Sequence, residues 1–203
     1  MRRGPAALAV LALCAAAAAG ALEWPVERPI VTGTFGEYRG DHFHLGLDIG
    51  GGEQVVHPVL AGELVFRYEE NADYSSLPRG VGSYAVIRHP DDVLSVYCHL
   101  RRDLERPART VYTVRDAVGV IGDTGYSAGK HLHFMVFDVQ AGSFVNPLSL
   151  LPPVADRDVG RHLDRGSDPQ VFAGPADRVM QETEQVRLAV AHEIGRASCR
   201  ERV

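Results

Sequence analysis

Short runs of β-branched and aromatic residues recur between about residues 30 and 148, and Gly, Pro and Asp separate them. Runs of this length and spacing are typical of antiparallel strands joined by hairpins. No part of this region shows a sustained helical period. The expected strands are 55–56, 63–66, 84–87, 94–97, 110–114, 118–121 and 131–139. We therefore predict a mainly β fold, a compact antiparallel β-sheet domain over residues 22–153 with its core at about 30–148.

Two connections in this domain stand out. Asp91 and Asp92 lie between two expected strands and predict a hairpin turn. Residues 69–82 form a long polar loop, and loops of this length are often functional. The loop is either one wall of a substrate groove or a simple surface excursion.

The first 21 residues have the pattern of a secretory signal peptide. Arg2 and Arg3 precede an apolar, Ala-rich run at 6–19, and small residues then offer cleavage sites. The run is too short to span a bilayer as a mature helix. A lipid anchor at Cys14 is disfavoured, because Leu13 precedes it where a small residue is expected. We predict an exported protein of the periplasm, cell envelope or extracellular space, with no stable membrane span after cleavage.

The composition changes after the β-rich region. Residues 154–176 are rich in Asp, Arg, Gly and Pro and are predicted to be a linker. Residues 177–194 mix helical and strand signals and are interpreted as the start of a second, truncated domain. Residues 195–203 are basic and break the preceding pattern, so we interpret them as a non-native tail.

Charge and cysteine content exclude two classes of protein. The net charge of −5 argues against nucleic-acid binding, which calls for a basic surface. Of the three cysteines, Cys14 leaves with the signal peptide and Cys199 lies in the suspected tail. Cys98 is then alone, and no intrachain disulfide is expected.

The histidine pattern points to a metal site. His44 and Asp48 are four residues apart with Gly46 between them, so one loop can bring both to one ion. His131 and His133 alternate within an expected strand and therefore share a face. His99 ends another expected strand. Four histidines and one aspartate can thus converge from three segments, although strand parity does not say which of His131 and His133 binds a metal.

Two histidines and one carboxylate are a known ligand set for catalytic zinc, which keeps a further position open for water. The competing interpretation is a set of histidines that never meet, and we prefer it for the isolated His57, His89, His162 and His192. His42, two residues before His44, is a minor competitor as a ligand.

Three motifs resemble the signatures of lysostaphin/LytM-type zinc endopeptidases, in the same order along the chain. They are His44-Leu45-Gly46-Leu47-Asp48-Ile49, Tyr97-Cys98-His99-Leu100 and residues 125–134, which read GYSAGKHLHF. Segments 59–65, 120–125 and 145–148 extend the resemblance over about residues 30–148.

The resemblance implies a compact antiparallel β domain with its metal in a groove over the sheet. It implies one Zn²⁺ held by His44, Asp48 and His133, with His99 and His131 as unligated catalytic histidines. The implied substrates are peptidoglycan peptides, cut in cross-bridges or stem peptides of the bacterial cell wall.

The sequence departs from the family pattern at three positions. Met135 stands where relatives usually carry Glu, Cys98 replaces a small residue, and His57 stands where Ala is common. None of these removes an implied ligand, so they bear on substrate preference. Cys98 is a poor nucleophile candidate, because alternation turns it away from His99 and buried cysteines are usually inert.

Two other functions remain as alternatives. The first is a non-hydrolytic module of the same fold that binds cell wall or activates a separate wall amidase. Such degenerate relatives lose zinc ligands, whereas this chain keeps all three and both extra histidines. The second is a structural zinc protein, which normally needs four protein ligands, often cysteines, and is disfavoured here.

Overall fold

The computed structural model describes residues 22–39, 42–70, 80–102 and 110–153. The predicted signal peptide, the linker at 154–176, the segment at 177–194 and the tail at 195–203 lie outside these residues, as does most of the 69–82 loop. In the part of the chain that is described, no helix is both long enough and apolar enough to cross a membrane.

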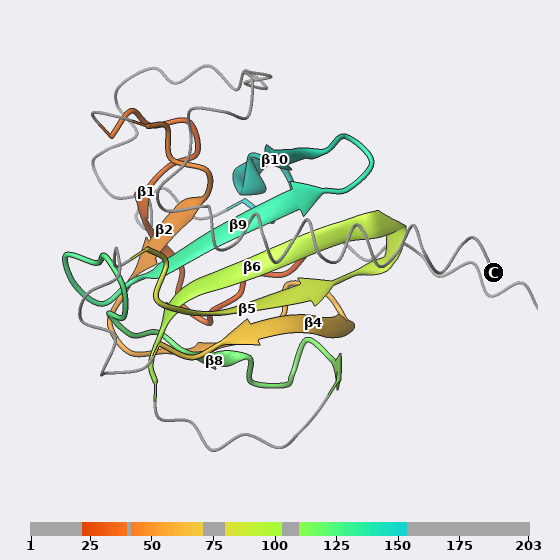
Figure 1. Ribbon diagram of the computed structural model, residues 1–203, viewed down its shortest axis with the longest axis horizontal. Helices are drawn as coiled ribbons and strands as arrows, with labels where there is room; N and C mark the ends of the chain where they lie inside the picture. The colour runs from red at the N-terminus through yellow and green to blue at the C-terminus, as the bar shows by residue number, and fades with distance from the viewer. Residues whose placement is uncertain (1–21, 40–41, 71–79, 103–109, 154–203) are drawn as a thin grey trace, which may run out of the picture.

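The described residues form an antiparallel β domain, and the predicted mainly β fold is confirmed (Figure 1). The elements are β1 (Ile30–Gly33), β2 (Leu47–Gly50), β3 (Val55–Val56), β4 (Gly62–Tyr68), β5 (Ser83–Arg88), η1 (Pro90–Asp92), β6 (Val93–Leu100), β7 (Val111–Tyr112), β8 (Gly119–Val120), β9 (Leu132–Asp138), β10 (Ser143–Val145) and η2 (Pro147–Ser149). The large sheet has the order β1-β2-β9-β6-β5-β4-β7, with β10 also paired to β9. β3 and β8 form a separate two-stranded sheet.

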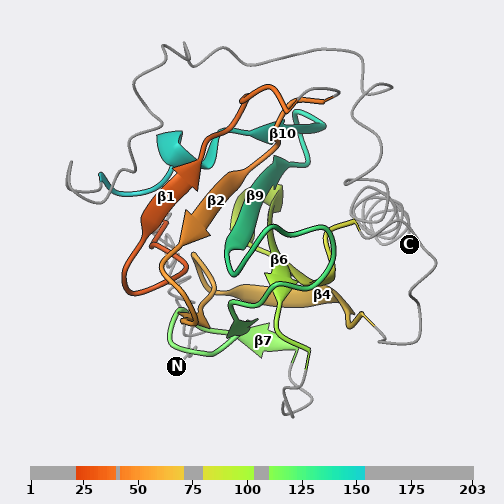
Figure 2. The same ribbon diagram turned by 90° about the vertical axis from the view of Figure 1, so that its left-hand side faces the viewer.

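Three strands were not expected from the sequence. β1, β2 and β10 are short, and β2 reads Leu-Asp-Ile-Gly, which is too brief to show a strand period. They form because β2 pairs with both β1 and β9, and β10 pairs with β9. Figure 2 shows β1, β2 and β9 as neighbours. The expected turn at Asp91 and Asp92 is a short 3₁₀ segment in which both residues have positive φ.

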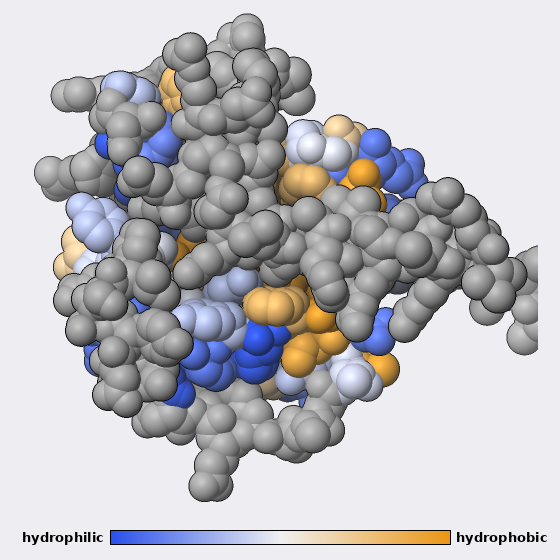
Figure 3. Space-filling model, in the orientation of Figure 1, coloured by the Kyte–Doolittle hydropathy of each residue, from blue (hydrophilic) through white to orange (hydrophobic). Residues whose placement is uncertain are grey.

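The central strands bury apolar side chains on both faces of the large sheet. In β9, Leu132, Phe134 and Val136 belong to one core cluster, whereas Met135 and Phe137 belong to a second. A strand buried on both faces shows a nearly continuous apolar run in place of alternation. Each fully buried Leu or Phe side chain contributes about 1.5–3 kcal/mol to folding. Figure 3 shows one face of the molecule, where the larger apolar patches of described residues lie to the right.

A buried polar network lies inside this β framework. His89 is buried, and its Nδ1 donates to the Ala61 carbonyl at 3.1 Å. Its Nε2 lies 2.7 Å from Ser95 Oγ, which is 2.8 Å from the Tyr97 hydroxyl. The Val59 N–H donates to that hydroxyl at 2.9 Å. The network satisfies buried polar groups, which are costly when left unpaired. His89 therefore has a structural role, as expected for an isolated histidine.

We expect His89 to make the fold sensitive to acid. Burial lowers the pKa of His89, although the hydrogen bond to Ala61 opposes this. Because the folded pKa lies below the unfolded value of about 6.5, this contribution to stability is fully present above about pH 6.5. It is lost as the pH falls below that value, by up to about 1.4 kcal/mol per pH unit. The free energy of unfolding, measured by urea titration at pH 7.5 and 5.0, should fall less in His89→Gln than in wild type. Equal losses in the two proteins would contradict this role.

Candidate metal centre

The centre is built where β2 and β9 pair. Asp48 in β2 lies directly opposite His133 in β9, and cross-strand partners carry their side chains on the same face. His44 comes from the loop that leads into β2. Gly46 lets this loop pass close to β9, since a Cβ at Gly46 would come within 2.3 Å of the Phe134 carbonyl oxygen.

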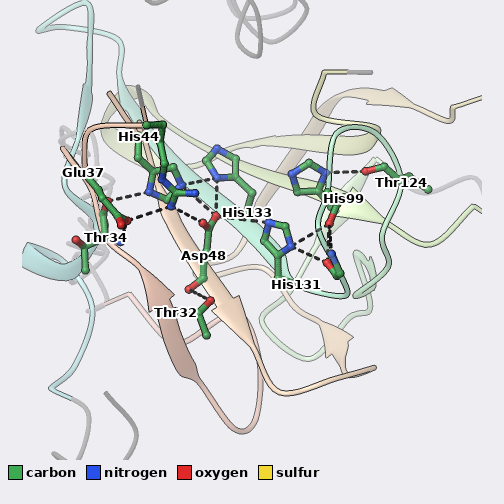
Figure 4. A network of polar contacts seen from close by, with 12 residues as sticks. Thr32, Thr34, Glu37, His44, Asp48, His99, Thr124, His131 and His133 are labelled. Atoms are coloured by element: carbon green, nitrogen blue, oxygen red, sulfur yellow. Dashed lines mark hydrogen bonds and ion pairs between the residues drawn. The ribbon is translucent and has the colours of Figure 1, made fainter. Parts of the chain in front are cut away.

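Three potential ligand atoms converge in this centre (Figure 4). His44 Nε2 lies 3.0 Å from Asp48 Oδ1 and 2.9 Å from His133 Nδ1. His133 Nδ1 lies 3.1 Å from Asp48 Oδ1. Ligand atoms on tetrahedral zinc, with bonds of 2.0–2.1 Å, are about 3.3 Å apart. The donor set and its spacing therefore fit zinc with a small expansion.

Contacts outside the centre orient two of these ligands. His44 Nδ1 donates to the Thr34 carbonyl at 2.8 Å, which leaves Nε2 with a lone pair directed into the centre. Asp48 Oδ2 accepts from Arg39 Nη2 at 2.8 Å. Burial acts to raise the pKa of Asp48, but hydrogen bonds and charge from His133 and His44 hold it far below its usual range. The centre thus presents an ionised carboxylate and two imidazoles.

His99 reaches the centre through an unusual backbone conformation. Cys98 lies opposite His133, so strand alternation alone would turn His99 to the other face. His99 has a φ of 58°, and its ring centroid lies 6.0 Å from that of His133 and 4.7 Å from that of His131. Positive φ is rare for residues other than Gly and clusters at functional sites.

A hydrogen bond to Thr124 fixes the ring of His99. His99 Nδ1 donates to the Thr124 carbonyl at 2.7 Å, and the Thr124 hydroxyl donates to the Leu100 carbonyl at 2.8 Å. Gly82 allows the close approach of this segment, because a Cβ there would come within 2.4 Å of the Thr124 backbone. Burial, with the nearby His133 and His131, lowers the pKa of His99 to about 3. The ring is therefore neutral at physiological pH.

His131 lies just before β9, and its side chain is more exposed than those of the three potential ligands. Its Nδ1 donates to the Gly129 carbonyl at 2.8 Å and lies 3.1 Å from Ser127 Oγ. Its Nε2 lies 3.6 Å from Asp48 Oδ1, farther than the atoms of the three-residue group. In Figure 4, His99 and His131 flank the centre on the side of His133.

The structure brings together all five residues that the sequence suggested: His44, Asp48, His99, His131 and His133. Among the described residues, the metal-capable group does not include His42. His57 Nδ1 instead contacts the Asp116 carbonyl at 3.1 Å, while His162 and His192 lie outside the described residues.

Sequence reasoning missed the residues that orient the centre. These are Thr34, Arg39 and Thr124, which act through contacts that span 9 to 25 residues of the sequence, so no local pattern marks them. Thr124 lies in segment 120–125 of the family resemblance. Met135 and Cys98 are fully buried in the second apolar cluster, on the face of the sheet that carries His133. Cys98 is the cross-strand partner of His133, so an apolar side chain lies next to this ligand on its own face of the sheet.

Comparison with known proteins decides the family. The sequence profile described as Peptidase family M23 matches residues 42–147. The chain belongs to peptidase family M23. The matched range includes all five residues of the centre, and the predicted resemblance to lysostaphin/LytM-type peptidases is confirmed.

Two of the curated relatives and one of the solved structures illustrate what this chain is similar to. The murein hydrolase activator NlpD of Escherichia coli K12 is 35% identical over 130 residues, covering 64% of this chain and 31% of that protein. An uncharacterized metalloprotease of Haemophilus influenzae is 36% identical over 74 residues, covering 36% of this chain and 15% of that protein. The matched part of this chain thus covers less than a third of the length of either relative.

The solved structure is a zinc-containing peptidase from Vibrio cholerae. It is 22% identical, covers 63% of this chain and 39% of that chain, and has a TM-score of 0.50. At this level of identity the similarity shows the fold of this M23 domain alone.

Proposed function

We propose that this M23 protein is an exported zinc metalloendopeptidase that hydrolyses peptide bonds in cell-wall peptidoglycan. The observation that carries the proposal is the convergence of three ligand atoms at 2.9–3.1 Å from one another, with two further imidazoles beside them. Three protein ligands with an open position are typical of a catalytic zinc site and not of a structural one.

In this proposal His44, Asp48 and His133 hold one Zn²⁺. When bound, zinc would act as a Lewis acid, which polarises a carbonyl and lowers the pKa of water. Met135 and Cys98 are buried apolar side chains on the sheet face that carries His133, and electrostatic interactions are stronger where water is excluded.

His99 and His131 are assigned to proton transfer and oxyanion stabilisation. A carbonyl can only accept, so the Nδ1 atoms that contact Thr124 and Gly129 carry the protons. In the form of each ring that carries only this proton, Nε2 holds a lone pair that can accept a proton from the attacking water. A ring protonated in this way becomes a donor, able to stabilise an oxyanion or to protonate the leaving amine.

Activation of a separate wall amidase is the second candidate function. The similarity to NlpD, named as a murein hydrolase activator, favours it. An activator that only binds its partner has no need for three convergent ligand atoms or for two oriented histidines beside them. The retained centre therefore favours hydrolysis.

We expect the purified, zinc-loaded protein to release peptides from purified peptidoglycan. Mass analysis of the soluble products identifies the bond cut, with a chelator-treated sample and Asp48→Ala as controls. A parallel sample contains a wall amidase, so that activation appears as faster release of amidase products. Peptide release that stops on chelation supports the peptidase. Amidase activation without peptide-bond cleavage, unchanged by chelation, would favour the activator instead.

A further inference from the structure

The two carboxylate oxygens of Asp48 have different partners. Oδ1 lies 3.0 Å from His44 Nε2 and 3.1 Å from His133 Nδ1, inside the group of ligand atoms. Oδ2 accepts a hydrogen bond from Arg39 Nη2 at 2.8 Å. One oxygen therefore faces the metal centre, and the other is held by a cation.

The same nitrogen of Arg39 has a second acidic partner. Its Nη2 also donates to Glu37 Oε2 at 3.1 Å, and the Thr34 N–H donates to the same Glu37 oxygen at 3.4 Å. The guanidinium thus lies between two carboxylates, one exposed and one at the metal centre. Because this segment also supplies the Thr34 carbonyl that orients His44, the hairpin between β1 and β2 positions two ligands at once.

Gly33 provides the space for the pair formed by Arg39 and Asp48. Gly33 lies opposite Asp48 where the register of β1 and β2 shifts. A Cβ at Gly33 would lie 2.5 Å from Arg39 Nη2 and 2.6 Å from Asp48 Oδ2. The absence of a side chain at this position is therefore required for the contact as it stands.

We propose that Arg39 is a positioning residue that restricts Asp48 to one oxygen at the metal centre. A carboxylate can bind a metal through one or both oxygens. If both oxygens of Asp48 bound, the second would fill a position that a catalytic site keeps open for water and substrate. Arg39 suits this role because its guanidinium is always charged and has fixed donor geometry. The inference rests on the zinc site of the proposed function.

The test replaces zinc by cobalt(II), whose visible absorption is more intense in four-coordinate than in five-coordinate sites. We expect Arg39→Met to bind one cobalt per chain with a weaker visible band than wild type. Its zinc form should cleave peptidoglycan about 10–100-fold more slowly, as is typical when a group that orients a metal ligand is lost. Arg39→Lys, which keeps a donor for Oδ2, should be intermediate in both measurements.

Two further variants separate this role from a general loss of charge or fold. Gly33→Ala keeps every charge but disturbs the pair, so it should weaken the cobalt band as Arg39→Met does. Arg115→Met removes an exposed arginine from the turn between β7 and β8 and should match wild type.

The outcomes distinguish this inference from the proposed function. A wild-type protein that binds neither zinc nor cobalt would overturn both. If the wild-type protein binds cobalt and the Arg39→Met variant gives the same cobalt spectrum, the inference about Arg39 is overturned. The proposed function is not affected by that result. Complete loss of cobalt from Arg39→Met would also overturn it, because Arg39 would then be needed for binding itself and not for restricting Asp48.

Discussion

His99→Ala and His131→Ala are each expected to keep bound zinc and to lose most peptidoglycan cleavage. Neither ring belongs to the group of ligand atoms, and His131 Nε2 lies 3.6 Å from Asp48 Oδ1. Both rings have Nδ1 occupied by a backbone carbonyl, so only Nε2 is left to exchange protons with the reacting groups. Loss of general acid–base catalysis typically costs about 10²–10⁴-fold in rate, and we expect a decrease in kcat of that size.

The measurement pairs zinc content with the rate of peptide release for each variant. Because His99 has positive φ, His99→Asn is a useful second variant, since Asn tolerates this conformation and cannot act as a base. His57→Ala is the matched control, a histidine whose Nδ1 contacts the Asp116 carbonyl away from the centre. Normal turnover in both His99→Ala and His131→Ala would contradict the mechanism even if zinc is present.

His44→Ala, Asp48→Ala and His133→Ala are each expected to abolish stoichiometric zinc binding and all cleavage. Wild type should bind about one zinc per chain. Each substitution leaves only two of the three converging ligand atoms. Asp48→Ala also removes the only anionic member of this three-residue group. Removing Asp48 further leaves Arg39 beside the centre without its buried carboxylate partner, which adds repulsion toward a cation.

Metal analysis after dialysis against trace zinc, together with circular dichroism, tests this expectation. The spectrum should remain that of a β protein, because the core clusters do not include these three residues. Full zinc occupancy in Asp48→Ala would refute the ligand assignment. A metal-free His131→Ala combined with a loaded His133→Ala would show that these two histidines have exchanged roles.

Much of this fold and its centre could be predicted from the sequence, because local features carry the information. Short β-branched runs between turn residues predicted the antiparallel sheet, and five of its strands overlap the expected ranges, namely β4, β5, β6, β7 and β9. The spacing of His44 and Asp48, and the alternation of His131 and His133, singled out residues that the structure brings together. Strands β1, β2 and β10 were missed, since they are too short to show a period and depend on their neighbours for pairing.

Only the tertiary structure decided how these residues are arranged. Alternation places His131 and His133 on one face but does not show which of them lies beside Asp48. The register of β2 against β9 sets His133 directly opposite Asp48. The place of His99 depends on a left-handed backbone conformation that overrides alternation and is held by the Thr124 carbonyl. The contact between Arg39 and Asp48 depends on the packing of a hairpin over Gly33. Sequence periodicity specifies which face a side chain takes, but register, backbone strain and contacts between distant segments are set only when the sheet is assembled.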